Sequence, residues 1–279
     1  MKSRTLHTNG ITLHYLDSVT DGPTLLLTHG LTANAHAFDG LIAAGLSTNL
    51  RVISVDLRGR GLSDKPATGY TMADHAADLI GLMDALELSN PIVGGHSFGG
   101  LLTFYLAHHY PDRMAKLVIL DAAAQLHPQT REMLIPAISR LGQTFASFDT
   151  YIAQIRSAPY MTGWDQAMTS YYRADVEELP DGSVRPRSTL DTITQAVTKG
   201  SFGEPWPDII RSVQQSVLLV NGRDHYALGA PLLPPDLALE TVAMMHNCRY
   251  VAVSGNHQTM LYGRGADQIT QAVTAFCLT

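Results

Sequence analysis

Short apolar runs alternate with longer helical patterns along most of this chain. Between the second and third runs, apolar residues from Met72 to Leu86 recur at helical spacing, and a second helical segment, LLTFYLAHHY, follows Ser97. Alternation of this kind predicts an α/β fold whose mostly parallel central sheet is flanked by helices. The runs, rich in Val, Ile or Leu as buried strands are, are TLLLTHG (24–30), RVISVDLRG (51–59), PIVGGHS (91–97), KLVILD (116–121), SVLLVNG (216–222) and RYVAVSG (249–255).

The pattern changes between residues 125 and 208. Helical segments broken by Gly and Pro replace the β-branched runs there, which predicts an inserted helical cap over 125–208 between core segments 1–124 and 209–279. LPDGSVRPR (179–187) is expected to be a polar turn within the cap. At the N-terminus, two segments joined at Asn9-Gly10 predict a hairpin at the sheet edge. The expected cap helices are PQTREMLIPAISRLG, DTYIAQIRS, WDQAMTSYYRAD and LDTITQAVTKG.

Composition and charge exclude several classes of protein. With 45% hydrophobic residues and a net charge of −6 the chain is globular and has no basic cluster, so we expect no nucleic-acid partner. The N-terminus is polar and no run approaches the roughly 20 apolar residues of a membrane span, so we expect a soluble, cytoplasmic protein without a membrane partner. Cys248 and Cys277 are too few for a disulfide framework or a four-ligand zinc site, and we expect reduced structural thiols. The sequence allows a homodimer.

One serine stands among glycines directly after an apolar run. GHSFG (95–99) matches the G-x-S-x-G motif, in which a strand turns sharply into a helix and presents the serine. An idle serine in a glycine-rich turn is the alternative, but the expected strand before Ser97 and helix after it favour the motif. A serine hydroxyl is a weak nucleophile, so it needs a general base and a carboxylate that orients the base.

Sequence position selects the base and the acid. Of the twelve histidines, His257 follows the last expected strand, where it can overhang the carboxyl edge of the sheet and meet Ser97. Asp224 follows the SVLLVNG strand and precedes the histidine, so it is our preferred acid. Asp121, at the end of KLVILD, remains the alternative acid. His96, next to the serine, is expected to pack or hydrogen-bond locally.

Backbone amides are expected to bind the oxyanion that forms on the attacked carbonyl. The candidates are the N–H of Phe98, directly after the nucleophile, and the N–H of Leu31, in the loop after the first buried strand. Side chains and backbone dipoles suffice for this chemistry, so neither a metal nor an organic cofactor is expected. Ordinary core packing is the favoured interpretation of four apolar cap residues, and an apolar pocket lining is the alternative: Tyr160, Met161, Trp164 and Met168.

Five motifs in order make the chain resemble the α/β-hydrolase superfamily over its whole length, in particular its capped branch of esterases, lactonases, haloperoxidase-like enzymes and carbon–carbon-bond hydrolases. They are HGLTAN for the oxyanion loop, DLRGRGLSDKP, GHSFGG for the elbow, VNGRD for the acid loop and GNHQTM for the histidine loop. Relatives with an aspartate nucleophile are disfavoured because this elbow carries Ser97. The HGLTAN loop and the DLRGRGLSDKPATGY stretch also resemble a hydrolase of amide-bearing pyridine-degradation intermediates.

The residues and the resemblance together predict a serine hydrolase that cleaves a small to medium carboxylic ester or lactone through an acyl-enzyme. Ser97 attacks, His257 shuttles the proton and Asp224 orients the imidazole. One alternative is cleavage of a carbon–carbon or amide bond by the same triad. Another is a ligand receptor on a hydrolase fold, in which turnover is slow and the cap signals to a partner.

Overall fold

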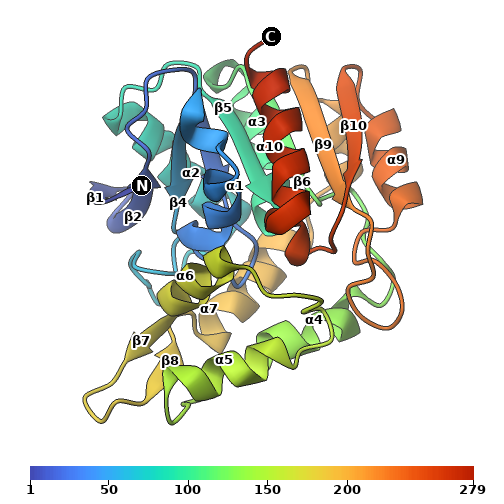
Figure 1. The fold of residues 1–279 in the computed structure, drawn as a ribbon. Coiled ribbons are helices and arrows are strands. Elements are labelled where there is room, and N and C mark those ends of the chain that lie inside the picture. The colour runs from blue at the N-terminus through green and yellow to red at the C-terminus, as the bar shows by residue number, and fades with distance from the viewer.

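An eight-stranded mixed sheet runs through the centre of the molecule (Figure 1). A computed structural model describes all residues from 1 to 279. The strands are β1 (Lys2–Thr8), β2 (Ile11–Asp17), β3 (Thr24–Thr28), β4 (Arg51–Val55), β5 (Ile92–His96), β6 (Lys116–Leu120), β9 (Ser216–Gly222) and β10 (Cys248–Val253). Their spatial order is β1-β2-β4-β3-β5-β6-β9-β10; β2 is antiparallel to both of its neighbours and the other pairs are parallel. The predicted mostly parallel sheet and the edge hairpin are confirmed.

Alternating side chains of the strands build two separate cores, one on each face of the sheet. In β3, Leu25 and Leu27 pack into one core and Leu26 into the other, as the two-residue period of a strand requires. The Leu25 face is covered by α1 (Asp39–Ala43) and α10 (Gly263–Cys277). The opposite face is covered by α2 (Met72–Ala85), α3 (Phe98–His109), α8 (Trp206–Arg211) and α9 (Pro235–Ala243).

Helix α10 illustrates how the outer helices attach. Its buried residues Ala266, Ile269, Val273 and Phe276 recur three or four positions apart, so they form one apolar stripe against the sheet. Exposed residues such as Arg264, Asp267 and Gln271 lie on the opposite side of the helix. No helix of the structure combines the length and the apolar character needed to cross a membrane.

Between β6 and α8 the chain leaves the sheet and forms a group of helices at its lower edge in Figure 1. Each of the four expected cap helices overlaps one observed helix. The last continues as a π-helix over Ala196–Ser201. The division into a cap over 125–208 and a two-part core stays a prediction. The helices are α4 (Thr130–Ile138), α5 (Phe148–Arg156), α6 (Gln166–Asp175) and α7 (Leu190–Gln195).

The expected polar turn at 179–187 is in part a small β-hairpin. Strands β7 (Val176–Glu178) and β8 (Val184–Pro186) pair antiparallel, and only the residues between them form the turn. Val176 and Val184 are buried, and Val184 exchanges two backbone hydrogen bonds with Phe145. Three-residue strands with so few apolar residues give no periodic signal, so the sequence pattern missed them.

Candidate active site

The serine of the G-x-S-x-G motif occupies a strained corner between β5 and α3. Ser97 has φ 55° and ψ −115°, a region that residues other than glycine rarely adopt. The neighbouring glycines make this corner sterically feasible: a Cβ on Gly95 would lie 2.2 Å from the Gly99 carbonyl carbon, and one on Gly99 would lie 2.2 Å from the Thr28 carbonyl oxygen. The Ser97 N–H donates to the Leu120 carbonyl at 2.9 Å, which ties the corner to β6.

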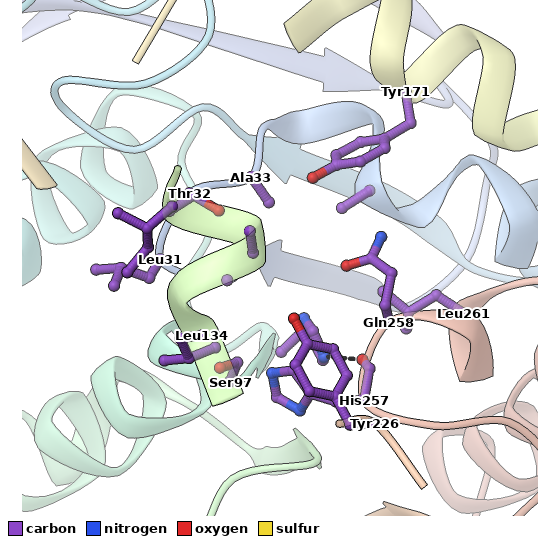
Figure 2. A pocket seen from close by; sticks show the side chains of 15 residues that line it. Leu31, Thr32, Ala33, Ser97, Leu134, Tyr171, Tyr226, His257, Gln258 and Leu261 are labelled. Carbon is purple, nitrogen blue, oxygen red and sulfur yellow. Dashed lines mark hydrogen bonds between the residues drawn. The ribbon is translucent and has the colours of Figure 1, made fainter. Parts of the chain in front are cut away.

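His257 lies in the loop after β10 and lines the same cavity as Ser97 (Figure 2). The buried Asn256 shapes this loop, because its side-chain oxygen accepts hydrogen bonds from the N–H groups of Gln258 and Thr259. The His257 carbonyl pairs with Nε2 of His96 at 2.8 Å, so His96 has the local structural contact that we expected of it. Burial lowers the pKa of His96 well below its usual value, so His96 is neutral and donates this bond.

Asp121, and not Asp224, contacts the imidazole of His257. The Asp121 carboxylate Oδ2 lies 2.7 Å from His257 Nδ1, and its Oδ1 accepts hydrogen bonds from Asn221 Nδ2 and the Gly222 N–H, both at 2.8 Å. The Asp121 side chain is 1% exposed. With Nδ1–H donating to this carboxylate, the imidazole presents its other nitrogen, Nε2, as a proton acceptor.

The structure therefore brings the alternative acid, Asp121, to the imidazole of His257 and does not bring the preferred acid, Asp224, there. Asp224 is exposed, and its Oδ2 accepts a hydrogen bond from the Gly255 N–H at 2.9 Å. The reason is the strand order: β6 lies between β5 and β9, so the residue directly after β6 lies beside the corner that holds Ser97. Asp224 comes two residues after the end of β9, where its N–H donates to the Gly255 carbonyl and its side chain is exposed.

The loop after β3 passes close to Ser97. A Cβ on Gly30 would lie 3.5 Å from the Ser97 Cβ and 3.2 Å from His96 Nδ1. Of the two expected oxyanion donors, the Leu31 N–H makes no hydrogen bond within the protein, and the Phe98 N–H is at the first position of α3, where an N–H has no partner within the helix. These N–H groups can bind a developing oxyanion, provided that a substrate carbonyl is placed between them.

Three side chains fix this loop, and the sequence analysis assigned no such role to any of them. His29 donates from Nδ1 to the Gly30 carbonyl and accepts at Nε2 from the Leu57 N–H, and burial holds its pKa at about 4 so that it stays neutral. Arg60 donates to the Leu31 carbonyl at 3.0 Å, and Arg140 of the cap donates to the Thr32 carbonyl at 2.9 Å. Arg60 lies within the DLRGRGLSDKP motif, which is the only sequence signal for it, and Arg140 has none.

The cavity above Ser97 is small and mainly apolar. Its volume is about 60 Å³, and its cap side is formed by Leu134, Ala137 and Ile138 of α4 and by Tyr171 of α6. The ring of Tyr226 meets the His257 ring edge-on at a centroid distance of 5.7 Å (Figure 2). None of the four cap residues proposed as lining borders this cavity; Tyr160 and Met168 are buried in the core, and Met161 and Trp164 pack against it.

The sheet order, the corner at Ser97 and the carboxylate–histidine pair define a hydrolase scaffold, and residues 23–226 match the model of the alpha/beta hydrolase fold family. The chain belongs to this family. It is 30% identical over 231 residues to 2-(acetamidomethylene)succinate hydrolase of Mesorhizobium japonicum, an alignment that covers 79% of this chain and 80% of the relative.

Solved structures give the same result. A crystal structure of E-2-(acetamidomethylene)succinate hydrolase superposes with a TM-score of 0.86 at 27% identity, covering 100% of this chain and 99% of the other. The enol-lactonase of Burkholderia xenovorans superposes with a TM-score of 0.73 at 21% identity, covering 99% and 100% of the two chains, which shows the shared fold alone.

Proposed function

We propose that this hydrolase cleaves a small carboxylic ester or lactone through an acyl-enzyme formed on Ser97. The observation that carries the proposal is the buried contact between Asp121 and His257 Nδ1 beside a serine held at a strained strand-to-helix corner. That contact fixes the tautomer in which His257 Nε2 can accept the serine proton. The proposal assigns to Asp121 the role that the sequence analysis gave to Asp224.

The proposed reaction has two half-reactions with the same groups. Ser97 Oγ attacks the substrate carbonyl while His257 Nε2 takes the hydroxyl proton, and the oxyanion is bound by the N–H groups of Leu31 and Phe98. The protonated His257 then gives its proton to the leaving oxygen, and the acyl group stays on Ser97. Water activated by the same imidazole attacks the acyl-enzyme and releases the acid. The Asp121 carboxylate stabilises the imidazolium in both halves.

Labelling by a fluorophosphonate probe, followed by turnover of a panel of p-nitrophenyl esters, tests this proposal. We expect one equivalent of probe on Ser97 and steady turnover of short-chain esters. Absence of labelling in the folded protein would contradict the nucleophile, and a stoichiometric burst followed by silence would favour a ligand receptor over an enzyme.

Amide hydrolysis by the same residues is a second candidate. It is favoured by the 30% identical relative, whose name specifies a substrate with an acetamido group. p-Nitrophenyl acetate and p-nitroacetanilide carry the same acetyl group on an oxygen and on a nitrogen, so the ratio of their kcat/KM values separates the two candidates. We expect the ester to be preferred, and comparable values would make this protein an amide hydrolase.

A further inference from the structure

We infer that the acyl side of the substrate carries no charge; the inference rests on the proposed function, since it concerns the cavity above Ser97. Fifteen residues line this cavity, and neither lysine nor arginine is among them. The side chains that the cap contributes are aliphatic except for the phenol of Tyr171. Gln258 and Tyr226 add neutral polar groups (Figure 2). The wall can therefore hydrogen-bond a substrate but supplies no cation for a carboxylate.

Arg140, behind the Thr32 part of the wall, is already neutralised. Its guanidinium donates to both carboxylate oxygens of Asp175, at 3.0 and 3.2 Å, and to the Thr32 carbonyl. The Arg140 and Asp175 side chains are 3% and 2% exposed. Although burial acts to lower it, the Asp175 charge holds the pKa of Arg140 well above its usual range. The pair is a closed unit without a donor left for a substrate.

Arg60, the other arginine near the site, is fully buried and does not line the cavity. It is 0% exposed, donates to the backbone carbonyls of Leu31 and Arg58, and has its guanidinium 5.4 Å from the centre of the Phe98 ring. Burial lowers the pKa of Arg60 to about 10, so it remains charged at neutral pH. Its buried Nη2 has no hydrogen-bond partner, but Arg60 is not among the residues that line the cavity.

The one ionised side chain in direct contact with the catalytic histidine is negative. Asp121 lies 2.7 Å from His257 Nδ1 and is 1% exposed, so little water screens its charge. A carboxylate on the acyl chain would lose its own hydration, meet no lysine or arginine in the cavity wall and be repelled by the Asp121 charge behind the imidazole. Each of these effects opposes binding, since burying an unpaired charge is among the most unfavourable events in a protein site.

The inference separates this protein from its 30% identical relative. The relative's name specifies a derivative of succinate, which is a dicarboxylate, whereas the cavity described above is built for a neutral group. Shared family and shared fold are compatible with this difference, because the residues on the cap side of the cavity select the substrate independently of the groups that perform the chemistry.

Methyl phenyl succinate and monophenyl succinate form a matched pair of test substrates. Both carry the same four-carbon acyl chain and release phenol, and they differ in one negative charge. After subtraction of the spontaneous rate, we expect kcat/KM for the neutral ester to exceed that for the anionic ester at least about 100-fold. Equal values, or a preference for the anionic ester, would overturn the inference.

A cap variant gives an independent measurement. Ile138 is half-buried and lines the cavity, so Ile138→Arg brings a cation to its cap side, and Ile138→Gln is the neutral control of similar length. We expect Ile138→Arg to narrow the preference for the neutral ester about tenfold and Ile138→Gln to leave it unchanged. Equal effects of both variants would show that charge is not what the cavity selects. If neither ester is hydrolysed and the fluorophosphonate probe fails to label Ser97, the proposed function is wrong and the inference falls with it.

Discussion

Replacement of Asp121 by asparagine tests the assignment of the acid most directly. Asp121 Oδ1 accepts from Asn221 Nδ2 and from the Gly222 N–H, while Oδ2 faces His257 Nδ1. In Asp121→Asn these two donors hold the amide oxygen on their side, which directs the NH₂ group toward His257. The imidazole must then accept at Nδ1 and carry its proton on Nε2. This tautomer cannot take a proton from Ser97.

The expected loss is about ten-thousandfold in kcat, equivalent to about 5.5 kcal/mol of transition-state stabilisation. The stability should change much less, because all three hydrogen bonds of the site can still form with neutral groups. Asp121→Ala would be a poorer test, since it leaves three buried donors without an acceptor at about 1–3 kcal/mol each and endangers folding.

Asp224→Asn is the matched control. Asp224 is exposed, and the asparagine oxygen can still accept the hydrogen bond from Gly255, so kcat should stay within about twofold of the wild type. Both variants are measured with p-nitrophenyl acetate and by urea denaturation. A large loss of kcat in Asp224→Asn together with a nearly active Asp121→Asn would refute the reasoning.

Three further predictions concern the nucleophile, one buried histidine and the buried ion pair of the cap. Ser97→Ala should lose at least about a thousandfold in kcat with p-nitrophenyl acetate while the circular dichroism spectrum is retained; persistent turnover by the folded variant would disprove the nucleophile. His29 has a pKa of about 4 in the folded protein against 6.5 in the unfolded chain, so the unfolded state binds its proton first as the pH falls. The free energy of unfolding should therefore be unaffected by His29 above pH 6.5 and about 2 kcal/mol lower at pH 5. Urea midpoints that do not change between pH 7.5 and 5 would contradict this prediction. Arg140→Met should lower the free energy of unfolding by about 3–5 kcal/mol because it leaves the buried Asp175 carboxylate without its partner. The double variant Arg140→Met, Asp175→Leu should lose less free energy of unfolding than the sum of the two single variants, and additive losses would argue against a coupled pair.

The strands of the core could be predicted from the sequence because each is a short, strongly apolar run. The six runs and the N-terminal hairpin coincide with observed strands of the sheet to within one or two residues, apart from trailing loop residues of some runs. The small hairpin of β7 and β8 could not be predicted in this way. Its strands have three residues each, and β8 also forms a bridge to Phe145, which is more than thirty residues away in the chain.

The difference between features set by the local sequence and features set by distant contacts also explains which parts of the candidate site the sequence predicted. Ser97 is encoded locally, because the glycines around it are needed by one corner of the chain. His257 is encoded by its position after the last strand. The choice between Asp121 and Asp224 is not local, since both follow a strand, both precede His257 and both can end at the same sheet edge. It is decided by how far each carboxylate lies past the end of its strand and by which strand adjoins β5.

Arg140 shows the limit of sequence reasoning more clearly still. The sequence pattern places Arg140 on a cap helix, where an arginine is ordinarily solvated. In the structure it lies in the turn after α4, is paired with Asp175 and donates to the main chain of the loop that carries the Leu31 amide. The contact joins segments more than a hundred residues apart. Through this contact the cap does more than cover Ser97. A change in the position of α4 would move the Thr32 carbonyl, and with it the neighbouring Leu31 N–H, which the proposed reaction uses to bind the oxyanion. In the proposed mechanism, the buried Arg140–Asp175 pair therefore connects the cap to the loop that carries the Leu31 N–H.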